Sequence, residues 1–263
     1  MNESFEKDLT WNSALYLHGD EQERYEQTMQ AIPFNCETLL DVGAGNGAFL
    51  HLLEQQHSKI KLSGIEYTIG GIRNKICNAK IHQGSIDKLP FDDQSVDIVS
   101  ALEVIEHLPV DVYKNGLIEL QRVAKMFILI SVPYQENRVT VECPNCGCGF
   151  NPNTHVRSFN DEKIKNLFTD FDLLTMRAMG KKREMYFGKY RRLAKNWFGD
   201  KTFPQQCVCP QCHFSKTGQQ QHESNIAGNI AQPQGYMRLI KKIFFYNTPR
   251  WYLAIYERKH NLK

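Results

Sequence analysis

Long apolar runs are missing from this sequence, and so are the features of a secretion signal. No apolar stretch approaches the roughly 20 residues that a membrane-spanning helix needs. The first residues, MNESFEKDLTWNS, contain neither a basic segment nor an apolar core. Eight cysteines in 263 residues are too few for a disulfide scaffold, and no internal repeat is present. These absences predict a soluble, cytoplasmic protein and argue against membrane-spanning and disulfide-rich classes.

The composition is that of an ordinary globular protein, but its charge is unevenly distributed. Hydrophobic residues make up 41% of the chain and charged residues 23%, and the length favours one large domain with insertions over two full domains. Residues 1–130 hold 11 Lys and Arg against 19 Asp and Glu, whereas residues 131–263 hold 21 against 10. The basic C-terminal half favours an anionic partner, such as an anionic substrate, nucleic acid or lipid headgroups.

Apolar strand-like segments alternate with helical segments through the first half of the chain. An acidic helix is expected over residues 19–32, ending at Pro33. Strands are expected at residues 37–43, 61–66, 80–83, 96–102 and 126–132, and the first and last of them should be buried. Helices are expected between them, over residues 46–55, 69–79 and 110–125. This alternation predicts a parallel sheet covered by helices on both faces.

The chain divides into three expected regions. Residues 1–35 form an N-terminal helical cap, residues 36–134 a nucleotide-binding core, and residues 135–263 the C-terminal part of the sheet. The C-terminal region should contain a helix over 160–168 and strands at 171–179 and 251–258. It also carries cysteine-rich insertions at 143–150 and 207–213, and a Gln-, Gly- and Asn-rich segment at 215–235 that we expect to be a mobile loop.

A glycine-rich loop joins the first strand to the following helix. Residues 41–47 read DVGAGNG, and glycines there let the backbone approach a ligand near a helix N-terminus. Glu66 ends the next strand, where a carboxylate can accept hydrogen bonds from both hydroxyls of a ribose. A dinucleotide fingerprint would place its third glycine one residue later. The spacing therefore favours a cofactor without a pyrophosphate, and an NAD-binding Rossmann enzyme is the alternative.

These residues resemble the class I S-adenosylmethionine-dependent methyltransferases over about residues 36–132. Residues 84–91 (GSIDKLPF) resemble the adenine-side loop of that family, residues 97–100 its fourth strand, and residues 103–108 (EVIEHL) the turn that follows. The resemblance implies a doubly wound, Rossmann-like α/β fold with a seven-stranded sheet. It also implies S-adenosylmethionine as cofactor.

The resemblance further implies roles for individual residues. Asp41 would lie near the methionine amino group, Glu66 at the ribose, and Tyr67 and Ile86 against the adenine, with Ser85 where the family often has Asp. The full expected cofactor-binding set is Asp41, Gly43, Ala44, Gly45, Asn46, Gly47, Glu66, Tyr67, Ser85, Ile86, Leu102 and Glu103.

Candidate catalytic residues follow the fourth strand. Methyl transfer mainly requires alignment of the acceptor with the methyl group, and it needs a base only if the acceptor keeps its proton. His107 is the first candidate base because an imidazole titrates near neutral pH. Glu106 precedes it, and His155 is a second candidate whose alternative role is a hydrogen bond at a helix entry. Catalysis by proximity alone is the third alternative.

The same turn also resembles a segment of another methyltransferase group. Glu103, Glu106 and His107 match the E-V-x-E-H segment of ubiquinone-pathway O-methyltransferases, which is associated with a divalent cation. An auxiliary metal at these residues is therefore an alternative to a direct catalytic role, and a purely loop-shaping role is another.

Two cysteine clusters predict a zinc site. Residues 143–148 (CPNCGC) and 207–213 (CVCPQCH) each contain C-P-x-C, a tight turn that aims two thiolates at one ion. We expect structural zinc on Cys143, Cys146, Cys209 and Cys212, with Cys148, Cys207 and His213 as substitutes. Both loops should leave the carboxyl edge of the sheet and form a zinc-tied substrate lid. Free or redox-active thiols are the alternative.

The segment from the first cluster to residue 159 also resembles zinc-knuckle methyltransferases of bacterial polysaccharide biosynthesis. We therefore expect O-methylation of a saccharide, a lipid-linked saccharide or another small molecule. RNA (tRNA) or protein methylation and a non-catalytic nucleotide-binding module are the alternatives. Basic, aromatic-rich stretches at 181–201 and 237–250 suggest peripheral contact with an anionic inner membrane face, with RNA as the rival partner and a solvated basic face as the simplest reading. The sequence leaves the oligomeric state open.

Overall fold

The computed structural model of the protein describes residue 11, residues 17–33 and 35–185, seven positions between 203 and 214, and residues 245–259. The chain forms two compact units. The sheet unit comprises residues 1–137, 156–180 and 249–263, and the cysteine unit comprises residues 138–155 and 181–248. The expected C-terminal region, 135–263, is thus shared between both units, because its two insertions fold together.

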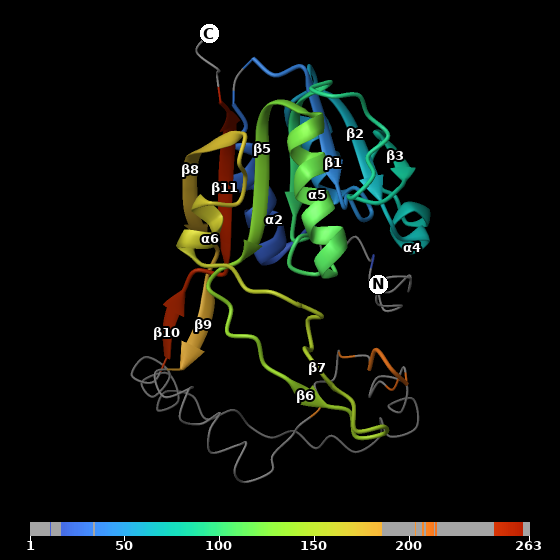
Figure 1. Cartoon of the computed structure of the whole chain (residues 1–263), viewed down its shortest axis with the longest axis vertical. Helices are drawn as coiled ribbons and strands as arrows, with labels where there is room; N and C mark the ends of the chain where they lie inside the picture. Colours follow the sequence, from blue (N-terminus) through green and yellow to red (C-terminus); the bar gives the residue numbers. More distant parts are fainter. Residues whose placement is uncertain are drawn as a thin grey trace. The chain divides into compact units, whose positions relative to one another are not determined.

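The sheet unit is built on one seven-stranded sheet in the order β3-β2-β1-β4-β5-β11-β8 (Figure 1). Its strands are β1 (Thr38–Val42), β2 (Lys61–Glu66), β3 (Lys80–Gln83), β4 (Val96–Leu102), β5 (Ala124–Pro133), β8 (Phe171–Met179) and β11 (Trp251–Arg258). The strands from β3 to β5 pair in parallel, whereas β11 is antiparallel to both of its neighbours. The structure confirms the expected seven-stranded, Rossmann-like fold.

Helices cover both faces of this sheet. They are α2 (Gly19–Met29), α3 (Ala48–Gln56), α4 (Ile69–Arg73), α5 (Val110–Val123) and α6 (Asp161–Lys165). Figure 1 shows α5 in front of the sheet and α2 behind it. Successive residues of β5 enter opposite layers, because side chains alternate along a strand. Ile128 belongs to the hydrophobic cluster of Leu120 in α5, and Leu129 to that of Phe49 in α3.

All helices expected from the sequence differ from the observed ones at their ends, and two of them, α4 and α6, are much shorter than expected. The helix expected over residues 69–79 stops at Arg73. Beyond it, the Ile76 amide donates to the Asn46 carbonyl in the glycine-rich loop (2.9 Å), so the backbone leaves its helical path. The helix expected over residues 160–168 spans only Asp161–Lys165, and Phe168 behind it is buried in the core.

Both insertions of the cysteine unit leave the sheet at its carboxyl edge. Trp251, the first residue of β11, pairs with Pro133 at the end of β5 and with Met179 at the end of β8. The first insertion forms a short hairpin of β6 (Val141–Glu142) and β7 (Gly149–Phe150). In the second, β9 (Lys182–Met185) pairs with β10 (Phe245–Thr248).

Several expectations concern residues outside the described part of the chain. They are the mobile loop at 215–235, residues 186–201 of the first basic stretch and residues 237–244 of the second. Within the described part, none of the helices has the length and apolar character that crossing a bilayer demands.

Candidate functional site

The glycine-rich loop runs from the end of β1 to the start of α3. Gly43, Gly45 and Gly47 all have positive φ angles, of 80°, 56° and 77°, which side chains other than glycine rarely adopt. The amides of Gly43 and Ala44 both donate to the Ile65 carbonyl in β2 (2.8 and 3.0 Å). The loop is therefore held by the neighbouring strand in a conformation that requires its glycines.

Each of these glycines also lies against a different neighbour. A Cβ atom added to Gly43 would lie 2.4 Å from Val104, and one added to Gly45 would lie 2.4 Å from the Trp11 ring. Val104 and Trp11 line a cavity next to the loop. At Gly47 the same atom would lie 2.4 Å from the sulfur of Cys77, which is buried. Gly43 therefore borders the cavity, Gly45 lies against the ring of Trp11, and Gly47 faces the core.

The cavity lies at the carboxyl ends of β1, β2 and β4. Of the expected cofactor-binding residues, its wall includes Gly43, Glu66, Tyr67, Ser85, Ile86 and Glu103. The candidate base His107 is also part of the wall. The other expected cofactor-binding residues lie in the loop or at the strand ends and do not line the cavity. They are Asp41, Ala44, Gly45, Asn46, Gly47 and Leu102. The lining residues that sequence reasoning missed are Trp11, Val42, Ile65, Thr68, Gly84, Val104 and Leu108.

Glu66 is a buried carboxylate bound to the glycine-rich loop. Its Oε2 accepts a hydrogen bond from the Gly45 amide (2.7 Å). Its Oε1 accepts from the amide and the hydroxyl of Thr68 (2.7 and 2.8 Å). A carboxylate has about four acceptor positions, so one on Oε2 is left for a ligand. In this conformation Glu66 keeps an acceptor position besides those used by its protein donors, and its role at a ribose stays a prediction.

Asp41 lies at the end of β1, buried below the loop. Ser100 in β4 donates to its Oδ1 (2.6 Å). Burial raises the pKa of Asp41 to about 6, although the Ser100 hydroxyl and the Arg24 guanidinium favour its charged form. A carboxylate this deep is suited to support the loop or to meet the cationic end of a ligand.

A buried arginine that sequence reasoning missed connects α2 to this edge of the sheet. Arg24 donates to the hydroxyl of Ser131 in β5 (3.3 Å) and pairs with Glu21 (2.9 Å). The Ser131 hydroxyl in turn donates to Oε1 of Glu103 (3.0 Å). No sequence motif marks Arg24, because its role depends on α2 packing against the end of β5.

The turn after β4 carries two of the candidate catalytic residues, Glu106 and His107. Residues 103–108 form turns rather than a helix, and Glu103 has a φ of 59°. His107 lines the cavity, whereas Glu106 is fully buried, with its Oε1 3.8 Å from His107 Nε2. Neither carboxylate oxygen of Glu106 has a hydrogen-bond partner among the described residues. Burial and the charge of Glu103 raise the pKa of Glu106 well above its usual range, which favours a protonated acid.

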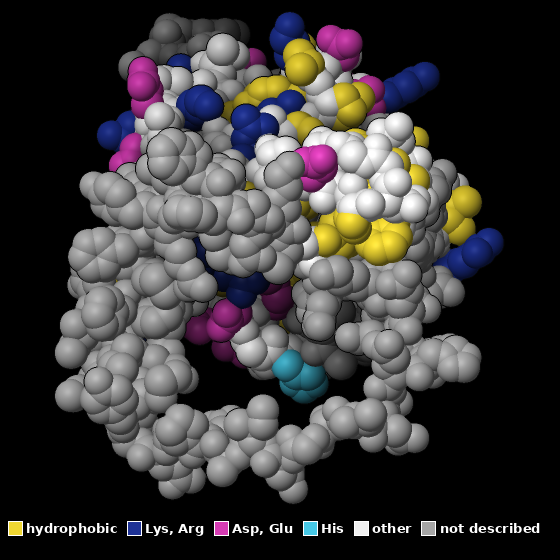
Figure 2. All heavy atoms as spheres, turned by 90° about the horizontal axis from the view of Figure 1, so that it is seen from below, with side chains coloured by type: hydrophobic (Ala, Val, Ile, Leu, Met, Phe, Trp, Pro, Cys, Tyr) yellow, Lys and Arg dark blue, Asp and Glu magenta, His cyan; other side chains and the backbone are white. Residues whose placement is uncertain are grey.

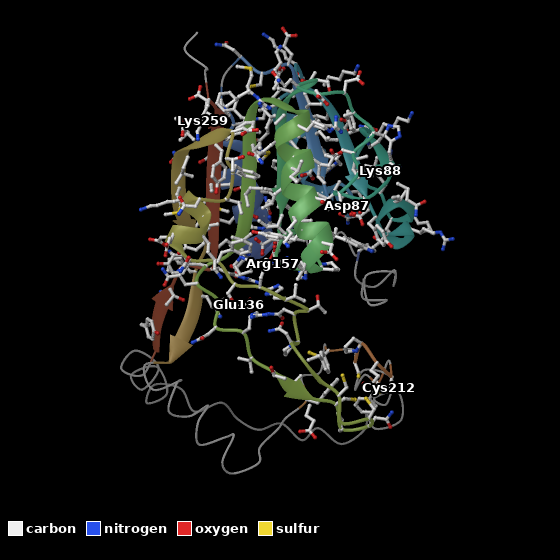
Figure 3. All side chains as sticks on the ribbon, viewed as in Figure 1. Asp87, Lys88, Glu136, Arg157, Cys212 and Lys259 are labelled. Carbon is white, nitrogen blue, oxygen red and sulfur yellow. The ribbon has the colours of Figure 1, made fainter. Side chains whose placement is uncertain are left out.

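The segment that returns from the cysteine unit supports this turn. The Val156 amide donates to the Glu106 carbonyl (2.9 Å), and the Arg157 guanidinium donates to the Ile105 carbonyl. Arg157 also lies over the ring of Tyr113 in α5, 3.9 Å from its centre. Figure 3 labels Arg157 below the lower end of α5. The position of the Glu106–His107 turn thus depends on Arg157, a residue of the segment ending at residue 159 to which sequence reasoning assigned no role of its own.

His155 belongs to the cysteine unit. Its backbone amide donates to the Asn151 side chain (3.3 Å). The entry to α6 is capped by Asn160, whose side chain accepts from the Lys163 amide (2.9 Å), as one sequence-based alternative predicted. A catalytic role for His155 stays a prediction.

The four expected metal ligands come together in the cysteine unit. The sulfur atoms of Cys143, Cys146, Cys209 and Cys212 all lie within 4.8 Å of one another. The Cys143–Cys212 and Cys146–Cys209 sulfur pairs are each 3.6 Å apart. Tetrahedral zinc–thiolate bonds of about 2.3 Å would place sulfurs roughly 3.8 Å apart, so the group could hold an ion of this kind. Figure 3 shows sulfur atoms gathered near the labelled Cys212.

Neighbouring groups shift the pKa values of these thiols in both directions, lowering those of Cys209 and Cys212 and raising that of Cys146. The Asn145 amide donates to the sulfur of Cys212 (3.4 Å) and lowers the pKa of that thiol to about 6, which favours the thiolate that binds metals. Phe203 is buried beside the cluster, where its ring lies 5.4 Å from that of Phe214. Cys207, an expected substitute ligand, instead points to the Pro152 carbonyl (3.8 Å).

The packing of Gly47 generates a stability prediction. Gly47→Ala should lower the free energy of unfolding by about 2–4 kcal/mol, because it combines a strained φ with a clash against Cys77. Gly19→Ala is the matched control, since Gly19 has a φ of 62° but no neighbour within 4 Å, and it should lose only about 1–2 kcal/mol. Denaturant unfolding of both variants measures the difference. Equal losses would show that Cys77 places no constraint on the loop.

Comparisons with known proteins agree with this geometry. Residues 40–126 match the family described as a methyltransferase domain. The chain is 28% identical over 150 residues to a Mycolicibacterium smegmatis protein named "Probable S-adenosylmethionine-dependent methyltransferase". This match covers 55% of the present chain and 55% of the relative, so the chain spans about half the length of that protein.

Solved structures share the fold at low sequence identity. A chain of the complex between the Haloferax volcanii Trm112 methyltransferase activator and a methyltransferase is 14% identical, with 99% of each chain covered and a TM-score of 0.55. A Haemonchus contortus phosphoethanolamine N-methyltransferase, solved with S-adenosylmethionine, is 11% identical, with a TM-score of 0.52 over 97% of this chain and 58% of its own. The family match over residues 40–126, the strand order and the glycine-rich loop together make the chain similar to the class I S-adenosylmethionine-dependent methyltransferases.

Proposed function

We propose that the protein binds S-adenosylmethionine in the cavity beside the glycine-rich loop and transfers its methyl group to an oxygen of a saccharide, a lipid-linked saccharide or another small molecule. The observation that carries the proposal is Glu66, a buried carboxylate that closes the loop through Gly45 and keeps one acceptor position open. The cofactor, when bound, supplies an electrophilic methyl group on a sulfonium.

The residues around the cavity fit such a ligand. Glu66 would accept a ribose hydroxyl, and the exposed ring of Tyr67 offers an apolar surface for the adenine, together with the buried Ile86. Asp41 and Glu103 add negative charge at the strand ends, which favours a cationic ligand. The cavity therefore provides a hydrogen-bond acceptor for a hydroxyl and carboxylates that can face a positively charged centre. S-adenosylmethionine has both kinds of group.

His107 is the proposed base in this arrangement. Its side chain is part of the cavity wall, so it can reach a proton on an acceptor placed there. Glu106 has a different part, since it is buried behind the wall and favours its protonated form. We assign His107 to taking the proton from an acceptor hydroxyl, and Glu106 to no proton transfer in this arrangement.

The acceptor class is the finer part of the proposal. Its support is the likeness of the segment from Cys143 to residue 159 to zinc-knuckle enzymes of polysaccharide pathways. On the face seen in Figure 2, the described Lys and Arg side chains are interspersed with acidic and hydrophobic ones, while most of both basic stretches lies outside the described residues. RNA and protein acceptors, and contact with an anionic membrane, are outcomes that the experiments below distinguish.

A binding measurement tests the cofactor assignment. Wild-type protein should bind S-adenosylmethionine and S-adenosylhomocysteine in isothermal calorimetry, and Glu66→Gln should weaken both by roughly tenfold or more, because a charged acceptor is lost. Glu23→Gln, on the exposed face of α2, is the matched control and should bind like wild type. Thermal unfolding shows whether the variants stay folded. Unchanged affinity in Glu66→Gln would contradict the ribose role.

A transfer measurement tests the acceptor class. The protein is incubated with methyl-labelled S-adenosylmethionine and fractionated cell extract, and we expect label in the saccharide or lipid-linked saccharide fraction. Glu66→Gln should transfer much less label under the same conditions. Label confined to RNA or to protein would replace the saccharide assignment with the corresponding alternative.

We also propose that the four-cysteine group holds one structural zinc ion. Four thiolates at tetrahedral spacing are the donor set of a closed structural site, with no open position for substrate. The described residues of the cysteine unit have few hydrophobic contacts besides those around Phe203, so a metal would supply much of its stability.

Elemental analysis of protein purified without chelator tests this assignment. Wild type should contain about one zinc per chain, and Cys209→Ser should lose most of it, because three thiolates hold the ion far less tightly. Cys207→Ser is the matched control, two residues away and outside the group, and it should keep its zinc. Metal-free wild type, or equal loss in both variants, would be evidence against the site.

A further inference from the structure

Trp11 lies at the cofactor cavity, although no motif singles it out. Its carbonyl accepts a hydrogen bond from the Asn46 side-chain amide (3.0 Å). Asn46 is buried, and its other side-chain atom accepts from the Ala48 amide at the start of α3 (3.2 Å). Asn46 therefore holds the backbone of Trp11 against the glycine-rich loop.

The indole ring covers the loop at one residue. Its Cζ3 lies 2.4 Å from the place where a Cβ of Gly45 would be, so the ring rests on the bare backbone of that glycine. The amide of the same glycine donates to Glu66. A hydroxyl bound to Glu66 would thus lie beside the indole, and Trp11 is part of the same cavity wall as Glu66, Tyr67 and Thr68.

We infer that Trp11 is a cofactor-binding residue, whose indole covers the bound ligand over Gly45 and excludes water from it. This inference rests on the proposed function. An indole offers a large apolar face for a nucleoside, and its negative π-face attracts a cation such as a sulfonium. Glycine is needed at position 45 for two reasons. Its φ is positive, and any larger residue would push the indole ring away from the ligand.

Because Trp11 is anchored through its backbone carbonyl, its side chain can be replaced without removing the anchoring hydrogen bond. Asn46 bonds to the backbone carbonyl, so Trp11→Ala removes the indole and leaves that hydrogen bond in place. By calorimetry, Trp11→Ala should bind S-adenosylhomocysteine roughly tenfold more weakly, the loss expected for one stacked aromatic contact. Trp11→Phe should recover most of the affinity. Both variants should unfold at nearly the wild-type temperature.

Fluorescence gives an independent measurement on the same residue. In a Trp197→Phe background, Trp11 and Trp251 are the remaining tryptophans, and Trp251 is only 3% exposed. Acrylamide should quench Trp11 in the free protein, and S-adenosylhomocysteine should protect it. The Trp11→Phe, Trp197→Phe double variant should show no ligand-dependent protection.

The outcomes separate this inference from the proposed function. If wild type binds S-adenosylhomocysteine and Trp11→Ala binds it with an affinity within about twofold of wild type, the role of Trp11 is overturned. The proposed function is then unaffected. Wild-type protein that binds neither S-adenosylmethionine nor S-adenosylhomocysteine overturns both. Tight wild-type binding, a weakened Trp11→Ala and protection of Trp11 together support the inference.

Discussion

The hydrogen bond from the Gly45 amide to Glu66 is the contact on which the candidate site depends. It joins the loop after β1 to the end of β2, next to the two amides that donate to Ile65. The buried carboxylate of Glu66 keeps its position because its Oε1 accepts two hydrogen bonds from Thr68. Glu66 is also part of the cavity wall, and Gly45 lies against the ring of Trp11.

Buried charge at the carboxyl edge is the second organising feature. Asp41, Glu103 and Glu106 lie near a single buried guanidinium, that of Arg24, whose charge acts on all three. Burial of more carboxylates than cations raises the pKa values of Asp41 and Glu106 and creates a region suited to a positive ligand. Functional sites commonly contain such unfavourable electrostatic interactions, because a bound ligand of opposite charge can relieve them.

The two insertions show how the fold carries a second unit without disturbing the sheet. They leave from the ends of β5 and β8, and Trp251 pairs with the last residue of each strand. The first insertion returns through Val156 and Arg157, which bind the turn carrying Glu106 and His107. The cysteine unit is thus connected, through the chain itself, to residues that shape the cavity.

Local sequence determined much of this protein. Sequence patterns predicted β2, β3, β4, β8 and β11 with their observed bounds. The reason is plainest for β4, whose seven residues are all buried and mostly apolar. The spacing of the glycines and Glu66 predicted the loop, and the two C-P-x-C turns predicted the group of four cysteines. These features depend on residues close together in the chain, or on a strand order that the family resemblance implied.

Tertiary structure alone decided the remainder. Helix α4 ends early because the Ile76 amide binds Asn46, and Gly47 faces Cys77 rather than the cavity. His107 and Glu106 are adjacent in sequence, yet the turn points one to the cavity and buries the other. Arg24, Arg157 and Trp11 act through partners far away in the chain, so neither periodicity nor spacing could indicate them. Local patterns encode backbone conformation and burial, whereas the direction and partners of a polar side chain exist only once distant segments have packed together.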